Sequence, residues 1–361
     1  MASHATPLPP TVDALTLEVL QAVVGAQPPG AEPSGFEIAS TSHAGEGAAS
    51  TADRVQIRLE YGDERPDGAP QHLVYKTVIA SQRAPTVMYE TEVRFYDEIR
   101  PDLAIETPRC FGTAIDRTNG RFAILLEDLA DRAASFPSAA TSLTTAQVET
   151  LLSNLAALHA HYWRSDRFDD DLAWVPTPIT GGMFDVFDTI GFELISDQLE
   201  RHPFKAEMIA RLDRSFDSMW DQLWAYQTEM AAAPTTLLHG DTHVGNTYLL
   251  PDGSAGFLDW QLMVRGRWAH DVIYLLATSM DRDLRRRHQE DLLRGYLAEL
   301  RGHGVAHVPD EAHAWELCRQ AALWGLVIGW LITPPENYGP VITTANLERV
   351  IAVVDELGSL R

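Results

Sequence analysis

Cysteine is scarce in this chain. Only two cysteines occur among the 361 residues, Cys110 and Cys318, and they lie far apart without a CxxC spacing. Two cysteines so placed cannot build a disulfide framework or a cysteine-based zinc site, and a reducing compartment fits them. The sequence therefore excludes a disulfide-stapled secreted scaffold.

Positive charge is also in short supply. The chain has 28 Lys and Arg residues against 51 Asp and Glu, a formal net charge of -23. A surface this negative repels phosphate backbones and anionic lipid, so we expect no nucleic-acid partner and no membrane partner. A generic solubility charge is the simplest interpretation, and steering of cationic substrates is the alternative.

Long apolar runs are missing. The longest, 321–332, falls short of the roughly 18 residues that a membrane span needs. The first 20 residues have no basic n-region and carry acidic residues where a signal peptide needs an apolar run. We therefore expect a cytoplasmic protein.

The first third of the chain has a strand pattern. Short β-branched or alternating segments separated by turn signals predict five strands. A helix is expected over 86–99, because Met88, Glu92, Phe95 and Ile99 share one helical stripe. Five strands with a helix after the third are the pattern of a kinase N-lobe. The expected strands are 36–40, 54–61, 71–79, 109–115 and 121–127.

Helical patterns dominate after residue 130. Thr144 and Gln147 form a capping box ahead of a helix over 148–163. The fold expected is α+β and two-lobed, with an N-lobe over 1–127 and a helical C-lobe over 128–361, since 361 residues exceed one hydrophobic core. Residues 1–10 are expected to form a loose tail, the further helices are 204–230, 270–280, 284–301, 311–331 and 343–357, and two short strands are 236–239 and 256–259.

The strongest chemical signal is the segment 239–246, HGDTHVGN, followed after a hairpin by LDWQ. Phosphoryl transfer needs a carboxylate that orients the attacking hydroxyl and oxygen ligands that hold Mg²⁺ on the phosphates. Asp241 and Asn246 on one tight loop, with Asp259 after the next strand, supply this set. Mg²⁺ prefers such hard oxygen ligands.

Two other interpretations of this segment stay open. An Asp in a glycine-containing turn can simply hydrogen-bond its own backbone. A metal-dependent phosphohydrolase could instead use His239, Asp241 and His243, together with the pair 270–271. That alternative explains neither Asn246 nor the first third of the chain.

A lysine and a glutamate form the second candidate constellation. Strand alternation places Lys76 on the same face as Val74 and Val78, where a lysine is costly without a partner. Glu92 lies on the apolar stripe of the following helix, whereas Glu90 lies about 200° around that helix. A Lys–Glu pair in this order is the kinase device that holds the α- and β-phosphates.

A glycine-containing loop precedes these elements. Gly45, Gly47 and Ser50 lie between two expected strands, so the loop is a hairpin lid and not the strand-to-helix turn of a dinucleotide fold. Glycines allow backbone N–H groups to approach phosphates closely. A flexible loop without a ligand is the alternative.

HGDTHVGN and LDWQ together resemble the catalytic and metal loops of the aminoglycoside phosphotransferase/choline kinase superfamily. The similarity is greatest to its bacterial phosphotransferases and its ecdysteroid-kinase-like branch. The resemblance implies that Asp241 is the catalytic base and that Asn246 and Asp259 are magnesium ligands. It also implies that His239 braces the loop and that Asp271 fastens it from below.

Further segments extend the resemblance over most of 36–281. GEGAAS resembles the family's lid, and 122–129 resembles the hinge that connects its lobes. At such a hinge, adenine would hydrogen-bond backbone groups near Glu127 to Leu129. His159, in the helix that also matches the family, is expected to be structural.

These features together predict a kinase that uses ATP or GTP and Mg²⁺. The metal loop has Asp-Trp-Gln in place of Asp-Phe-Gly and no APE motif follows, which favours a small hydroxylated molecule over a protein as acceptor. The acceptor would be aminoglycoside-like, or a sterol-like or lipid-like alcohol. A kinase-like protein that binds nucleotide without turnover is the remaining alternative, and the motifs do not indicate an oligomeric state.

Overall fold

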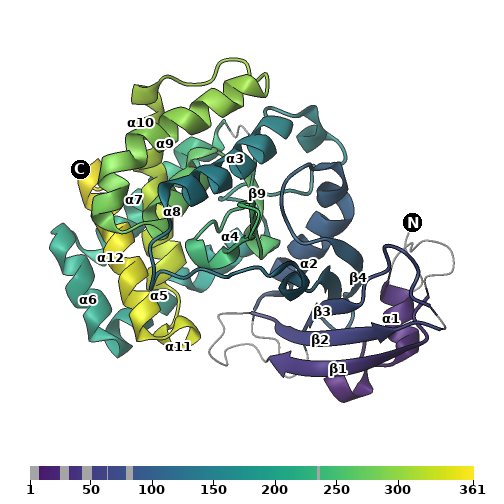
Figure 1. Ribbon diagram of the computed structural model, residues 1–361. Coiled ribbons are helices and arrows are strands. Elements are labelled where there is room, and N and C mark those ends of the chain that lie inside the picture. The colour runs from purple at the N-terminus through teal and green to yellow at the C-terminus, as the bar shows by residue number, and fades with distance from the viewer. Residues whose placement is uncertain (1–7, 25–31, 43–50, 63, 79–83, 234–235) are drawn as a thin grey trace. The chain divides into compact units, whose positions relative to one another are not determined.

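The computed structural model describes residues 8–24, 32–42, 51–62, 64–78, 84–233 and 236–361. The chain divides into two compact units (Figure 1). The first comprises Met1–Asp102 with Thr107–Ala134, and the second comprises Leu103–Glu106 with Ser135–Arg361. No helix in the described part of the chain has the length and apolar character to cross a membrane.

The first unit is built on a five-stranded antiparallel sheet in the order β1-β2-β3-β5-β4. All five expected strands are present, and the expected helix over 86–99 is α2, Thr86–Arg94, continued by a π-helical turn. The strands are β1 Gly35–Ser42, β2 Asp53–Glu60, β3 His72–Thr77, β4 Cys110–Asp116 and β5 Arg121–Glu127.

Period-two burial in the strands gives this sheet two apolar faces. Val55, Ile57 and Leu59 of β2 alternate with exposed or half-buried residues and share one core with α1, Leu17–Val23. On the other face, the ring of Tyr89 in α2 stacks on Phe122 at 4.5 Å between centroids. The sheet is thereby held between two helices, of which the sequence predicted only α2.

The expectation of a loose tail over residues 1–10 is wrong at Leu8. This side chain is buried in the same core as α1, and its carbonyl oxygen accepts a hydrogen bond from Arg121. Burial of the leucine explains the difference, since an apolar side chain of this size gains about 1.5–3 kcal/mol on leaving water. Residues 1–7 lie outside the described residues.

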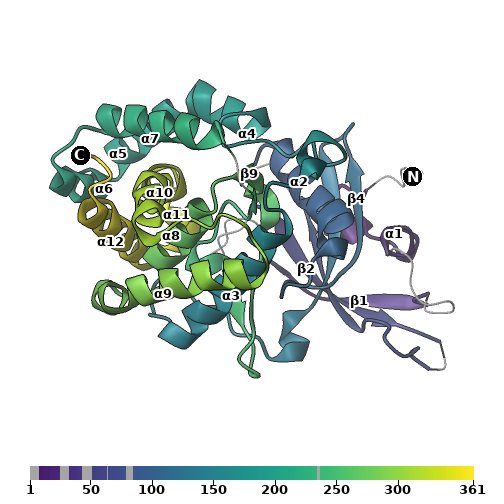
Figure 2. The same ribbon diagram turned by 90° about the horizontal axis from the view of Figure 1, so that it is seen from above.

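The second unit is mainly helical, and α8 lies among α3, α9, α10 and α12 (Figure 2). Every residue of α8 is buried, so it is the core helix of this unit. The predicted capping box at Thr144 and Gln147 is confirmed at the start of α3. The helices are α3 Thr145–His161, α4 Gly181–Val186, α5 Phe192–Arg201, α6 Pro203–Ile209, α7 Phe216–Ala231, α8 Ala269–Ser279, α9 Arg282–Gly302, α10 Glu311–Trp324, α11 Pro335–Tyr338 and α12 Pro340–Leu357.

The single helix expected over 204–230 is wrong, because α6 and α7 are separate. Asp213 adopts a left-handed conformation with φ of 52°, which ends the first helix. Ser215 then caps α7, and its side chain accepts a hydrogen bond from the N–H of Ser218. Short polar side chains that compete for backbone groups thus override the apolar periodicity here.

Two short strand pairs complete the second unit. β6 Thr236–Leu238 pairs with β9 Val264–Gly266, and β7 Thr247–Leu249 pairs with β8 Ala255–Phe257. Both pairs are antiparallel. The loop between β6 and β7 and the segment between β8 and β9 carry the HGDTHVGN and LDWQ motifs.

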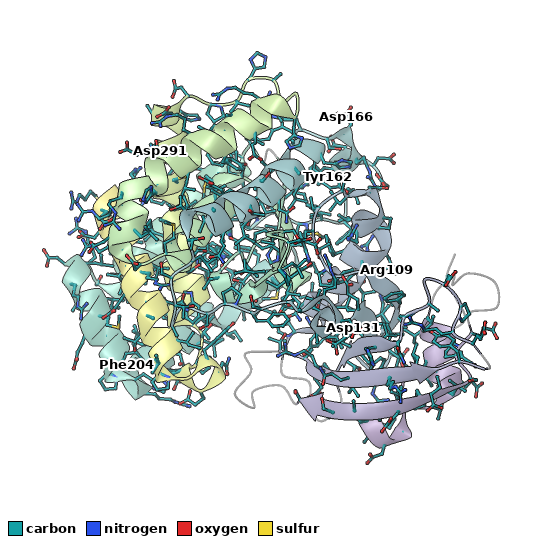
Figure 3. The ribbon with its side chains drawn as sticks, in the orientation of Figure 1. Arg109, Asp131, Tyr162, Asp166, Phe204 and Asp291 are labelled. Atoms are coloured by element: carbon teal, nitrogen blue, oxygen red, sulfur yellow. The ribbon has the colours of Figure 1, made fainter. Side chains whose placement is uncertain are left out.

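Lys205 of α6 is fully buried, next to the Phe204 that is labelled in Figure 3. Its ammonium group donates hydrogen bonds to the carbonyl oxygens of Trp330 at 3.3 Å, Leu331 at 2.9 Å and Thr333 at 2.6 Å. Two of these carbonyls belong to the last residues of the helical segment that continues α10, Gly325–Leu331, and the third follows it, where a helix leaves carbonyl oxygens without a donor of its own. Lys205 thus terminates that segment and ties it to α6.

We expect Lys205→Met to lower the free energy of unfolding by about 2–4 kcal/mol, because buried carbonyl oxygens lose their donor. Urea denaturation of the purified variant measures the change. Arg287→Met, on an exposed position of α9, is the matched control and should stay within about 0.5 kcal/mol of wild type. Equal effects of the two substitutions would contradict the anchoring role of Lys205.

Candidate active site

The loop that follows β6 begins with a turn that only glycine can make. Gly240 has a φ of +85°, and a Cβ atom at this position would lie 2.0 Å from the carbonyl oxygen of Leu262. The carbonyl is backbone and cannot move aside as a flexible side chain could. Because the segment after Asp259 passes so close, position 240 has room only for glycine.

A buried carboxylate in α8 holds the first residues of this loop. Asp271 accepts the N–H of His239 at 2.7 Å and the N–H of Gly240 at 2.9 Å. His159 lies 3.2 Å from the same carboxylate, and its other ring nitrogen contacts the hydroxyl of Tyr296. Burial alone would raise the pKa of Asp271, but the hydrogen bond and charge of His159 hold it below its ordinary value. The expected roles of Asp271 as fastener and of His159 as a structural residue are confirmed.

His239 connects the loop to the end of β8, just before Asp259. Its Nδ1 accepts the N–H of Asp241 at 3.2 Å, so the proton is on Nε2, which donates to the carbonyl oxygen of Leu258 at 2.8 Å. Burial lowers the pKa of His239, which favours this neutral tautomer. The expected brace is thus confirmed.

Asn246 is oriented by the predicted catalytic aspartate. Its Nδ2 donates to the backbone oxygen and to Oδ2 of Asp241, both at 2.9 Å. Its backbone oxygen accepts the N–H of Leu258 at 2.8 Å, which brings the residue before Asp259 onto the same loop. With Nδ2 engaged in this way, Oδ1 is the atom of Asn246 that is placed to bind a cation.

Asp259 stands in an unusual backbone conformation after β8. Its φ of 64° is left-handed, which is uncommon outside glycine and frequent at functional sites. Burial and the charge of Asp259 together raise the pKa of Asp241 to about 7. Two carboxylates that repel each other, beside an amide oxygen, form an environment that a divalent cation would stabilise. The residues present therefore fit a magnesium ion.

The arrangement does not form the hydrolase site considered from the sequence. Among the described residues, no group of three His, Cys, Asp or Glu side chains is placed to hold a metal ion. Both ring nitrogens of His239 bind the protein, and Nδ1 of His243 accepts the N–H of Gly245. Nε2 of His270 donates to the carbonyl oxygen of Gly240. These histidines therefore shape the loop.

In the first unit, Lys76 and Glu92 form the ion pair that the alternation predicted. Nζ of Lys76 lies 2.8 Å from one carboxylate oxygen of Glu92 and 2.7 Å from the other. Both side chains are buried, whereas Glu90 pairs with the exposed Arg117. Lys76 faces α2, because its neighbour Tyr75 belongs to the core on the α1 side of the sheet.

The structure describes only two of the remaining predicted nucleotide-binding residues, Glu127 and Leu129. Gly45, Gly47 and Ser50 lie outside the described residues, so their assignment stays a prediction. Glu127 ends β5, and its carboxylate accepts the N–H of Arg109. Leu129 is buried at the start of a 3₁₀ turn that ends near Asp131, which Figure 3 labels.

Comparison with known proteins gives the family. A family model described as the ecdysteroid kinase-like family matches residues 44–305. This span is more than half of the chain and contains every residue assigned above. The chain belongs to the ecdysteroid kinase-like family. The family resemblance and the α+β kinase-like fold expected from the sequence are thereby confirmed, and the chain is a member of a family of kinase-like phosphotransferases.

Solved structures that are similar to this ecdysteroid kinase-like protein have low sequence identity to it. An ethanolamine kinase from Plasmodium vivax is 14% identical, with a TM-score of 0.52 over 91% of this chain and 83% of that one. The GDP and kanamycin complex of APH(2")-IIia is also 14% identical, with a TM-score of 0.48 over 89% of this chain and 94% of that one. A search of curated proteins finds no match.

Sequence reasoning missed one residue beside the catalytic loop. Tyr274, three residues after Asp271 in α8, is buried, and its ring lies 6.1 Å from that of His243 in the loop. In the sequence it is one more apolar residue of a buried helix. Its spacing from Asp271 was the available signal, since positions i and i+3 lie on one helical face.

Gly240 and Gly253 both have a positive φ, but an added Cβ clashes only at Gly240. Comparing them distinguishes the cost of the clash from the cost of the backbone conformation. Gly253, with a φ of +89°, has no atom within 4 Å of an added Cβ. We expect Gly253→Ala to cost about 1–2 kcal/mol of unfolding free energy for the left-handed conformation. Gly240→Ala should cost clearly more, because the Cβ meets the Leu262 carbonyl. Chemical denaturation of both variants checks the order, and equal costs would contradict the close approach.

Proposed function

We propose that this ecdysteroid kinase-like chain transfers the γ-phosphoryl group of ATP to a hydroxyl group of a small molecule. One observation carries the proposal. The loop 239–246 places the carboxylate of Asp241 and the amide of Asn246 in hydrogen-bond contact, with Asp259 brought beside them through the Leu258 N–H. Phosphoryl transfer requires a carboxylate base and oxygen ligands for the metal ion.

Each group has a definite part in the proposed reaction. Asp241 would orient the acceptor hydroxyl and accept its proton as the acceptor oxygen bonds to the γ-phosphorus and the bond to the β-phosphate oxygen breaks. Asn246 and Asp259 would hold Mg²⁺, which neutralises charge on the phosphates when it is bound. ADP and the phosphorylated acceptor are the products.

The nucleotide would also be bound by groups of the first unit. Lys76, held by Glu92, would contact the α- and β-phosphates, and backbone N–H groups around Gly45, Gly47 and Ser50 would cover them. The base, adenine or guanine, would hydrogen-bond backbone groups from Glu127 to Leu129. In this proposal residues 1–127 are the nucleotide lobe and 128–361 carry catalysis and the acceptor site, in a cytoplasmic protein.

We expect Mg²⁺-dependent binding of ATP that is lost in Asp259→Ala. Calorimetric titration should show an affinity at least about tenfold weaker for the variant in Mg²⁺, because one of the two protein ligands is gone. Asp291→Ala, an exposed carboxylate of α9 labelled in Figure 3, is the control for the change in net charge and should bind like wild type.

These titrations and an assay of ATP hydrolysis and phosphoryl transfer on the same protein decide between the proposed function and a nucleotide-binding protein. ATP binding without measurable transfer or hydrolysis would favour a nucleotide-binding protein without turnover. If neither ATP nor GTP binds, with or without Mg²⁺, the proposed function is wrong. A positive result leads to acceptor screening, with amino sugars set against sterol-like and lipid alcohols.

Lys76 offers an independent test, because Lys76 and Lys205 are the only two lysines in the chain. We expect an ATP analogue that acylates amines near its phosphates to modify Lys76, and excess ATP to protect it. Lys205 is fully buried in the second unit and should stay unmodified as an internal control. Peptide mass spectrometry reads both sites, and modification of Lys76 that ATP does not reduce would contradict its assignment.

A further inference from the structure

One row of residues crosses the sheet of the first unit at the level of Lys76. Cross-strand pairing places Arg54 of β2 directly opposite Lys76 of β3, and Lys76 directly opposite Ile124 of β5. Residues that lie directly opposite one another in an antiparallel sheet point to the same face. In order across the five strands, the row consists of Ser42, Arg54, Lys76, Ile124 and Thr113.

Contacts with α2 and its continuation show which face this row occupies. The hydroxyl of Thr113 donates to the carboxylate of Asp97, and Nζ of Lys76 donates to Glu92. Asp97 lies in the π-helical turn that continues α2, and Glu92 lies in α2 itself. Arg54 therefore points to the face of the sheet that carries the Lys76–Glu92 pair, away from the core that includes α1.

Arg54 is a half-buried cation for which the described residues supply no anion. Both oxygens of the nearby Glu92 carboxylate are engaged by Lys76. Like charges directly opposite one another on neighbouring strands destabilise a sheet, so the position of Arg54 has a cost. Other arginines of this unit have a carboxylate partner, and these pairs are Arg58–Glu37, Arg117–Glu90 and Arg132–Glu127. An anionic ligand beside Lys76 would offset the repulsion.

The segment expected to bind the base lies toward the opposite end of these strands. The N–H of Asp128 donates to the carbonyl oxygen of His72, at the start of β3. From His72 to Lys76 the strand rises by roughly 13 Å. In the proposed function the base bonds the backbone of 127–129 and the phosphates reach Lys76. The nucleotide then extends along the strands, and its phosphates lie at the row that contains Arg54.

We propose that Arg54 is a second phosphate-binding residue of the nucleotide site, an inference that rests on the proposed function. Lys76 is held by Glu92 and presents a point charge to the phosphates. The planar guanidinium of Arg54 presents parallel N–H donors that match two oxygens of one phosphate group. The ligand class is a nucleoside diphosphate or triphosphate, whose adjacent phosphate groups can bind both cations of the row.

Calorimetric titration of ATP in Mg²⁺ compares Arg54→Met with wild type, and GTP takes its place if the wild type binds only GTP. We expect an affinity about tenfold weaker or worse, because charge-assisted hydrogen bonds to a phosphate are lost. Arg58→Met is the matched control, since Arg58 lies on the same strand and the same face. Its guanidinium pairs with Glu37 near the expected base site, so we expect binding within about twofold of wild type.

Melting temperatures separate ligand binding from a purely structural role. Without nucleotide, Arg54→Met removes a like charge opposite Lys76, so its melting temperature should equal or exceed that of wild type. Bound ATP with Mg²⁺ raises the melting temperature, and the rise should be smaller for Arg54→Met than for Arg58→Met. Arg54→Lys keeps the charge without the fork and should bind with an affinity between those of wild type and Arg54→Met.

The outcomes separate the two proposals. Wild-type protein that binds neither ATP nor GTP overturns the proposed function and the role of Arg54 together. Wild-type protein that binds nucleotide while Arg54→Met binds it equally well overturns the role of Arg54 alone. A lower melting temperature of Arg54→Met without nucleotide, with the full rise on adding ATP, also overturns it. If Arg54→Met does not fold, Arg54→Lys with wild-type affinity overturns the bidentate contact.

Discussion

The two hydrogen bonds that Asp271 accepts from the backbone of His239 and Gly240 are the interaction on which the rest of the site depends. A buried carboxylate needs such partners, and the loop needs an acceptor for N–H groups that no strand satisfies. The pairing fixes where the loop leaves β6. His239 then sets the position of Leu258, and Leu258 sets that of Asn246 and Asp259.

Much of the fold followed from local patterns. Alternation marked the strands, and it also placed Lys76 on the face where Glu92 meets it. The spacing of Asp241, Asn246 and Asp259 marked the loop, because only one tight turn and one hairpin separate them in the sequence. The loose tail over 1–10 and the single helix over 204–230 were wrong, since burial of Leu8 and capping by Ser215 outweigh what the local pattern indicates.

The contacts that the sequence could not reveal join distant segments. Tyr274 meets Gly325 and Gly329 some fifty residues later, and Lys205 meets carbonyl groups about 125 residues away. Neither pairing leaves a periodic signal, because a tyrosine in an apolar helix and two glycines in another are ordinary by themselves. Such contacts are set by tertiary packing, which a single sequence does not display.

The hydrogen bond between the Leu258 N–H and the Asn246 carbonyl oxygen has a consequence for recognition. It belongs to the folded backbone, so the two proposed cation ligands are already adjacent before any ligand arrives. The conformational entropy of bringing them together is lost when the chain folds, and binding does not have to lose it again. This corner of the molecule is therefore preorganised for the proposed cation.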